Sequence, residues 1–118
     1  MKIQILGTEY EIIVKKYDED ESFKKDSIDG YCSSYSKQIV VCDMSTKERW
    51  GDATEHEALV ATKQTIRHEI VHAFLSESGL AESSAQYSGG WATFEEMVDW
   101  IAIQAPKMHQ AFVDAGAL

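Results

Sequence analysis

The sequence predicts an α+β fold, with a small antiparallel sheet in the N-terminal half and two helices in the C-terminal half. Apolar residues alternate with polar ones in the first part of the chain, which is typical of strands that bury one face. The second part contains two helix-capping sequences and no glycine between Gly51 and Gly79. Strands followed by helices indicate an α+β arrangement. Because compact domains usually contain about 50 to 200 residues, we expect residues 1–118 to form a single domain.

The N-terminal strands are predicted to pair as two hairpins. In the first, a Gly7-Thr8 turn separates two runs in which every second residue is apolar. These apolar residues are Ile3, Ile5, Tyr10, Ile12 and Val14. The polar and acidic stretch that follows, residues 15–29, is predicted to be an exposed loop.

The second hairpin is predicted over residues 30–43, with a turn near Ser36 and Lys37. Its second strand, Gln38–Cys42, contains three consecutive β-branched residues, which favours a strand covered on both faces. The alternative is that this strand lies at an edge of the sheet, where an extended peptide pairs with it through backbone hydrogen bonds.

The longer helix is predicted at residues 55–77. Thr54 and Glu57 form a capping box at its start, in which each side chain binds the backbone of the other residue. Gly79 is a typical helix end. A polar loop, residues 80–91, is expected to follow.

A second capping box, Thr93 with Glu96, is predicted to begin the second helix. This helix should continue towards Ala105. The residue before a proline avoids helical geometry, so we expect Pro106 to kink or end the helix there.

Composition excludes several classes of partner. The chain has 20 acidic and 11 basic residues, a net charge of −9 and no basic cluster, which disfavours nucleic acid. The N-terminal apolar stretch is interrupted by Gln4, Gly7 and Glu9, unlike a signal peptide, and no apolar run is long enough to span a membrane. We therefore expect a cytoplasmic protein. Its two cysteines are too few for a disulfide scaffold.

A candidate metal site lies in the longer helix, where residues 68–72 read His-Glu-Ile-Val-His. His68 and His72 are one helical turn apart, so both imidazoles project from the same side and can reach one ion. Glu69 lies beside them, where it can take a proton from a metal-bound water. The surrounding residues are largely apolar: Ile66, Ile70, Val71, Ala73, Phe74 and Leu75. The pattern therefore predicts a zinc site in a buried stretch of helix.

A catalytic zinc usually has three protein ligands, and Glu95 is the predicted third. Helical spacing places Glu95 and Asp99 together on one flank of the apolar stripe of the second helix, whereas Glu96 points away. Asp99 could then accept a hydrogen bond from a ligand histidine and hold its tautomer; the alternative is a solvated helix residue. His56 is ~18 Å from His68 along the same helix, and His109 lies beyond the proline, so neither is favoured.

Together, His68-Glu69-x-x-His72 and Glu95-x-x-x-Asp99 resemble the gluzincin metallopeptidases. The resemblance covers roughly residues 30–105 and extends to compact zincins of phages and prophages, including metallopeptidase domains that cleave repressors in mobile elements. It implies a minimal zincin-like domain that binds one zinc ion per chain through His68, His72 and Glu95. It also implies that Glu69 is the general base of peptide-bond hydrolysis, acting on a peptide or protein substrate. The chain lacks the second helical domain of larger gluzincins, which supplies substrate-binding residues.

Hydrolysis also requires a group that stabilises the oxyanion, and Tyr87 is the candidate. It precedes Glu95 in the loop between the helices, where some gluzincins carry a tyrosine or histidine. Tyr31, Tyr35 and His109 are the alternatives, and Tyr87 could instead be a packing residue.

Two other functions fit parts of the sequence. A structural zinc module would use Cys32, Cys42, His68 and His72, but the nine residues between the cysteines exceed the usual spacing of zinc ligands, and Glu69 would have no role. A zincin-like binding or regulatory protein with little or no activity would keep the metal, although it would not need the base at position 69.

Overall fold

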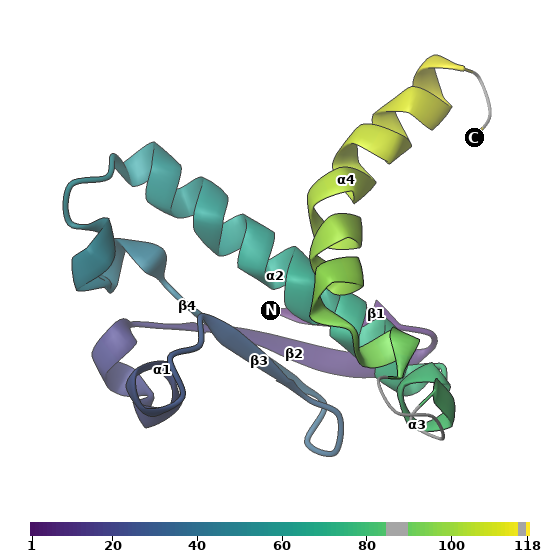
Figure 1. Ribbon diagram of the computed structural model, residues 1–118, viewed down its shortest axis with the longest axis horizontal. Coiled ribbons are helices and arrows are strands. Elements are labelled where there is room, and N and C mark those ends of the chain that lie inside the picture. The colour runs from purple at the N-terminus through teal and green to yellow at the C-terminus, as the bar shows by residue number, and fades with distance from the viewer. Residues whose placement is uncertain (85–89, 116–117) are drawn as a thin grey trace.

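The computed structural model confirms the α+β fold and describes residues 1–84, 90–115 and 118 (Figure 1). The strands are β1 (Lys2–Ile5), β2 (Thr8–Lys15), β3 (Gly30–Ser33) and β4 (Gln38–Cys42). The α-helices are α1 (Glu21–Lys25), α2 (Glu55–Glu77), α3 (Leu80–Ser84) and α4 (Glu95–Asp114). Short 3-10 turns are η1 (Tyr17–Glu19), η2 (Met44–Thr46), η3 (Glu48–Trp50) and η4 (Trp91–Thr93). Among these described residues, no helix is long and apolar enough to cross a membrane.

The sheet is mixed rather than antiparallel, with the strand order β1-β2-β4-β3. Both predicted hairpins form, because β1 pairs antiparallel with β2 and β3 pairs antiparallel with β4. The hairpins join through β2 and β4, however, and these two strands are parallel. This arrangement places the most apolar strand, β4, in the centre, where both of its faces are covered. β4 is therefore not an edge strand, and the free edge near the C-terminal helices is β3.

The first hairpin turns one residue earlier than predicted. Leu6 and Gly7 occupy the turn with φ angles of 49° and 86°, and Thr8 is already the first residue of β2. A two-residue hairpin turn with both φ angles positive matches the right-handed twist of the strands. The Leu6 side chain is exposed, so the local conformation and not packing determines its position.

The segment predicted to be an exposed loop contains ordered structure instead. Asp20 caps the short helix α1 by accepting a hydrogen bond from the Ser22 amide at 3.1 Å. Phe23 of this helix is buried against β4 and η2. A single buried aromatic residue in an acidic segment has no periodic pattern, so the sequence did not indicate it.

The core lies on the two sides of β4. Ile39 and Val41 pack with residues of β1 and β2 and with Ala73 of α2. Val40 and Cys42 point to the other side and pack with a second group, which comprises Phe23, Met44 and Ala58. The helix α2 covers the face formed by Ile39 and Val41, and its N-terminal part contributes Ala58 to the second group (Figure 1).

Both ends of α2 are held by side chains. The predicted capping box of Thr54 and Glu57 is present at its start. At its end, Glu77 accepts hydrogen bonds from Thr8 Oγ1 at 2.6 Å, Tyr10 OH at 2.9 Å and Lys37 Nζ at 2.8 Å. These donors, with Lys37 contributing most, lower the pKa of Glu77 to about 2. The helix that carries the two histidines is therefore anchored to both hairpins.

The helix α4 begins and ends at different residues from those predicted. Phe94, rather than Thr93, precedes its first residue, and the Thr93 hydroxyl donates to the Gly90 carbonyl at 2.9 Å. The helix continues through Pro106, which has no N–H to donate to the carbonyl of Ala102 four residues earlier. Arg67 of α2 donates its Nε–H to that carbonyl at 2.7 Å. A side chain from the neighbouring helix thus replaces the hydrogen bond that the proline removes.

We expect Arg67→Met to lower the free energy of unfolding by about 1.5–3 kcal/mol, because it leaves the Ala102 carbonyl without its charged donor. In a Pro106→Ala chain, the amide of residue 106 can bind that carbonyl, so the same Arg67 substitution should cost less than half as much. Urea unfolding of the four proteins in this double-mutant cycle measures the difference. Equal costs in both backgrounds would show that Arg67 does not compensate for the proline.

Candidate metal centre

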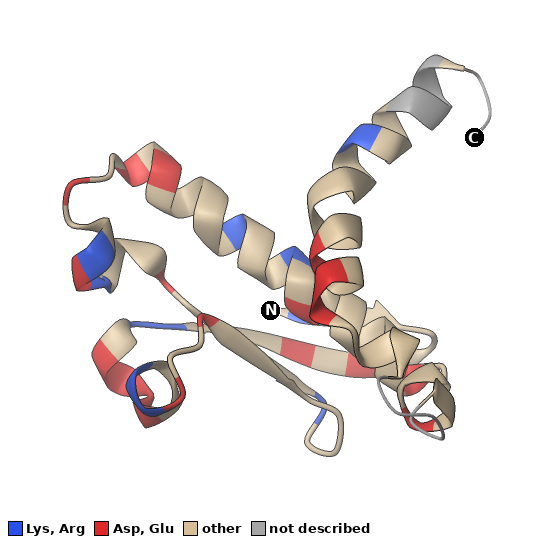
Figure 2. Ribbon diagram, viewed as in Figure 1, with Lys and Arg blue, Asp and Glu red and all other residues tan. Residues whose placement is uncertain are grey.

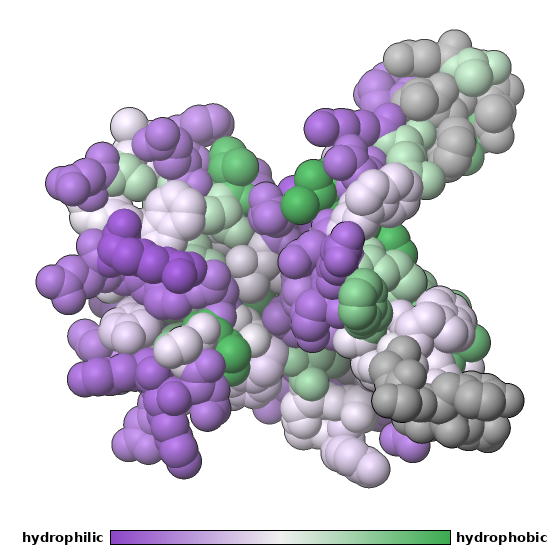
Figure 3. Space-filling view, viewed as in Figure 1, coloured by the Kyte–Doolittle hydropathy of each residue, from purple (hydrophilic) through white to green (hydrophobic). Residues whose placement is uncertain are grey.

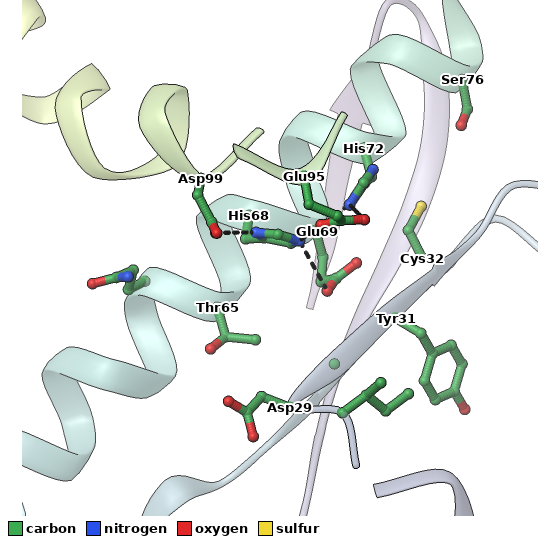
Figure 4. Close-up of a pocket in the computed structure, with 13 residues that line it drawn as sticks. Asp29, Tyr31, Cys32, Thr65, His68, Glu69, His72, Ser76, Glu95 and Asp99 are labelled. Atoms are coloured by element: carbon green, nitrogen blue, oxygen red, sulfur yellow. Dashed lines mark hydrogen bonds and ion pairs between the residues drawn. The ribbon is translucent and has the colours of Figure 1, made fainter. Parts of the chain in front are cut away.

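Two histidines of α2 point their ring nitrogens at the same place (Figure 4). His68 Nε2 and His72 Nε2 are 3.1 Å apart, and the rings meet edge to face with centroids 4.8 Å apart. Their spacing of four residues explains this arrangement, since such side chains lie one above the other on a helix. Both imidazoles line a cavity between α2, α4 and β3.

The first turn of α4 brings a carboxylate to the same place. Glu95 Oε2 lies 3.1 Å from His68 Nε2, and Glu95 Oε1 lies 3.3 Å from His72 Nε2. Tetrahedral zinc with bonds of 2.0–2.2 Å separates its ligand atoms by about 3.4 Å. The three side chains therefore fit the spacing of a zinc site. Glu96 points to a different surface, beside Trp100.

A second carboxylate of α4 holds one of the histidines. Asp99 Oδ1 lies 2.7 Å from His68 Nδ1 and accepts a hydrogen bond from this ring N–H. With the proton on Nδ1, the lone pair of His68 Nε2 faces Glu95 and His72. This is the arrangement in which an outer carboxylate orients a metal-binding histidine.

Glu69 is buried beside the histidines. Its side chain lies 4.0 Å from His68 Nε2, farther than Glu95, and the residue is only 5% exposed. Burial raises the pKa of Glu69 to about 7; His68 opposes this shift, and the charges of Glu95 and Asp99 add to it. Burial also lowers the pKa of His72, which favours the neutral imidazole that binds metals.

The cavity concentrates negative charge. Glu69, Glu95 and Asp99 surround the two imidazoles, and acidic residues gather where α4 crosses α2 (Figure 2). No lysine or arginine is among the described residues that line the cavity. Carboxylates held close together without a cation repel one another. A divalent cation would relieve this repulsion. The charges of the cavity and the spacing of the ligand atoms therefore both favour a divalent metal ion.

The edge strand β3 forms the wall of the cavity opposite α2, and the sequence did not single it out. Gly30 and Cys32 line the cavity, whose volume is about 570 Å³. A side chain at Gly30 would crowd both α2 and β4, because an added Cβ would lie 3.0 Å from Thr65 Cγ2 and from the Val40 carbonyl oxygen, and 3.2 Å from Glu69 Cγ. The sequence signal that could have identified β3 as the edge strand is the unbroken apolar pattern of β4. This pattern favours a central position for β4 and therefore leaves β3 at the edge.

Gly30→Ala should lower the free energy of unfolding by about 1–3 kcal/mol, the usual range for added volume at a tightly packed position. Adding Thr65→Ser should recover part of the loss, because serine lacks the methyl group that the new Cβ meets. Thr65→Ser alone is the control, and urea unfolding is the measurement. A Gly30→Ala protein as stable as the parent would show that β3 can move away from α2 at little cost.

The two cysteines lie on different sides of the sheet. Cys32 packs on the side of α2, whereas Cys42 is fully buried in the cluster around Phe23 and Met44. Burial, together with the charge of Glu69, raises the pKa of the Cys32 thiol to about 11. This geometry disfavours the four-ligand structural site, because Cys42 does not line the cavity with the histidines.

The predicted oxyanion-stabilising residue, Tyr87, lies outside the described residues. Two of its alternatives are directed elsewhere: the Tyr31 hydroxyl donates to Asp20 Oδ2 at 2.9 Å, and Tyr35 is 95% exposed in the turn between β3 and β4. His109 is exposed on the far part of α4, and His56 is exposed in the first turn of α2. Neither histidine lines the cavity.

No family model, curated protein or solved structure matches this chain. Membership of the gluzincins therefore stays a prediction, based on the two helical motifs. The strongest indication of function is the geometry of the site, in which ligand atoms of His68, His72 and Glu95 lie 3.1–3.3 Å apart.

Proposed function

We propose that the protein is a zinc-dependent peptidase that hydrolyses peptide bonds in the cavity between α2, α4 and β3. The observation that carries this proposal is the convergence of His68, His72 and Glu95, whose ligand atoms are 3.1–3.3 Å apart, beside the buried carboxylate of Glu69. Three protein ligands leave a coordination position for water, as catalytic rather than structural zinc sites do.

In this proposal His68, His72 and Glu95 hold the metal, and Asp99 orients His68 through the 2.7 Å hydrogen bond. Zinc supplies a Lewis acid that acidifies water and polarises a carbonyl group. The four protein groups come from only two helices. The crossing of α4 over α2, which includes the bond from Arg67 to Ala102, therefore sets the geometry of the site.

Glu69 is the general base. Its carboxylate accepts a proton from the attacking water and then gives that proton to the leaving amine. Burial, opposed by His68 and reinforced by the charges of Glu95 and Asp99, raises the pKa of Glu69 to about 7. A cation nearby would favour the ionised form, so the loaded site would contain a carboxylate able to accept a proton at neutral pH. Burial also keeps bulk water from competing for this proton.

An extended peptide would bind along β3. The Cys42 amide donates to the Asp29 carbonyl at 2.8 Å, so alternate residues from Asp29 onwards bond to β4. The backbone groups of Gly30 and Cys32 then face the open edge, and both residues line the cavity. Adding the peptide as a further strand would place its backbone beside Glu69 and the histidines.

A mixture of unmodified peptides of varied sequence tests the proposal. The protein loaded with one equivalent of zinc should cleave some of these peptides, a chelator should stop cleavage, and added zinc should restore it. Mass spectrometry of the products gives the cleaved bonds and the sequence preference. A protein that binds one zinc per chain but cuts no peptide in the mixture would instead be a zinc-bearing binding protein.

A further inference from the structure

An apolar stripe that is largely exposed to solvent begins at Phe94, just before α4, and continues along the first turns of this helix. Phe94, Met97, Trp100 and Ile103 follow one another at intervals of three residues and line a shallow groove of about 450 Å³. Side chains three apart are neighbours on a helix surface, so the stripe is continuous. Phe94 is 54% exposed and Trp100 is 56% exposed.

This stripe is separate from the face that holds α4 in place. Val98 and Ala102 are fully buried where α4 packs on α2, and neither lines the groove. A contiguous exposed apolar patch on a small protein usually marks a binding surface. Tryptophan is also the residue type that most often contributes binding energy at the centre of such surfaces.

The charges around the stripe indicate what it binds. Glu96 and Asp99 line the groove, and no lysine or arginine is among the described residues that do so. Figure 3 shows hydrophobic and strongly hydrophilic side chains next to each other at the base of α4. An acidic border on a chain of net charge −9 attracts basic groups. It repels anionic lipid surfaces and a second copy of the same face, so a basic and apolar segment is the favoured occupant.

The groove adjoins the cavity of the candidate metal centre. Asp99 lines both, so the first two turns of α4 form the ridge between them. One polypeptide can therefore occupy the cavity with an extended segment and the groove with another segment. We propose that the groove is a docking site for an amphipathic helical segment of the polypeptide substrate, one that carries apolar and basic side chains. Its assignment to a substrate rests on the proposed peptidase function, whereas the binding of such a segment does not.

Synthetic peptides of about 14 residues, roughly four helical turns, test the groove directly. One peptide has a leucine face and a lysine face, a second replaces lysine with glutamate, and a third replaces leucine with serine. Calorimetric titration into the zinc-loaded Glu69→Gln protein measures binding without cleavage. We expect the Lys/Leu peptide to bind at least tenfold more tightly than the other two, because only this peptide matches both the stripe and its acidic border.

Matched variants place the binding on α4. Trp100→Gln with Ile103→Gln should weaken binding of the Lys/Leu peptide at least ~10-fold, because truncation at the centre of an interface has the largest effect on affinity. Leu59→Gln with Val60→Gln, an equally exposed apolar pair on α2, should leave it unchanged. Glu96→Gln should weaken it by about two- to fivefold, and by less at high salt, while Glu55→Gln serves as the control.

Equal effects of the two apolar double variants, or equal binding of the Lys/Leu and Lys/Ser peptides, would overturn the proposal. So would binding to anionic vesicles or self-association that disappears with Trp100→Gln and Ile103→Gln, since those results assign the groove to a membrane or to a second copy. If the protein cleaves no peptide in any assay but still binds the Lys/Leu peptide, the peptidase proposal is wrong and the docking site is retained. If it cleaves small peptides but does not bind the Lys/Leu peptide, the docking proposal is wrong and the peptidase function is retained.

Discussion

Replacing Glu69 with glutamine should leave the protein folded and loaded with zinc, while peptide turnover falls at least ~100-fold, the low end of general acid–base contributions. Glutamine keeps the size of the side chain and some of its hydrogen bonding, but it cannot accept the proton of the attacking water. Glu69 is 5% exposed and more distant from His68 Nε2 than Glu95 is, so its loss should not remove a metal ligand. Turnover of a cleaved peptide, together with the zinc content of the purified protein, measures both halves of this prediction.

The control for Glu69→Gln is Asp99→Asn. This change alters the hydrogen bond to His68 Nδ1 and should weaken zinc binding by about ten- to a hundredfold. The general base, Glu69, stays intact. Activity of Asp99→Asn should therefore recover as zinc is added, whereas activity of Glu69→Gln should not. If Glu69→Gln cleaves a verified substrate as fast as the parent, Glu69 is not the general base.

Glu95→Ala should weaken zinc binding by more than ~100-fold. Glu95 is a proposed direct ligand, because its two carboxylate oxygens lie 3.1 and 3.3 Å from the histidine nitrogens. Losing a ligand should cost more affinity than losing an outer hydrogen-bond partner of a ligand, which costs about ten- to a hundredfold. The parent should bind one zinc per chain. Competition with a coloured chelator measures the affinity.

Two controls accompany this variant. Glu96→Ala removes the same charge from the same helical turn but on the other surface of α4, so it should change zinc affinity little. Cys32→Ser with Cys42→Ser should leave the zinc stoichiometry unchanged, since neither cysteine is a proposed ligand and Cys42 lies away from the cavity. Equal losses from Glu95→Ala and Glu96→Ala would show that Glu95 is not a ligand, and loss of zinc in the cysteine variant would replace the whole ligand set.

Features that depend on neighbours along the chain could be predicted from the sequence. The range of α2, its capping box and the pairing of both hairpins follow from local periodicity and turn chemistry, and the structure confirms them. Helical spacing also predicted that Glu95 and Asp99 share one flank and that Glu96 points away, which is how the structure places them. A fixed rotation of about 100° per residue determines such directions before any tertiary contact forms.

Features that depend on contacts between distant segments could not be predicted in this way. The hairpins could be joined through either strand of the second one, and burial of both faces of β4 selected the parallel pairing that leaves β3 at the edge beside Glu69. Pro106 is a local signal for a helix end, but Arg67, 39 positions earlier in the sequence, supplies the missing donor and lets α4 continue. The sequence by itself determined which side chains share a helix face. Only the tertiary structure decided which faces meet, because that choice depends on the burial and hydrogen bonding of groups far apart in the chain.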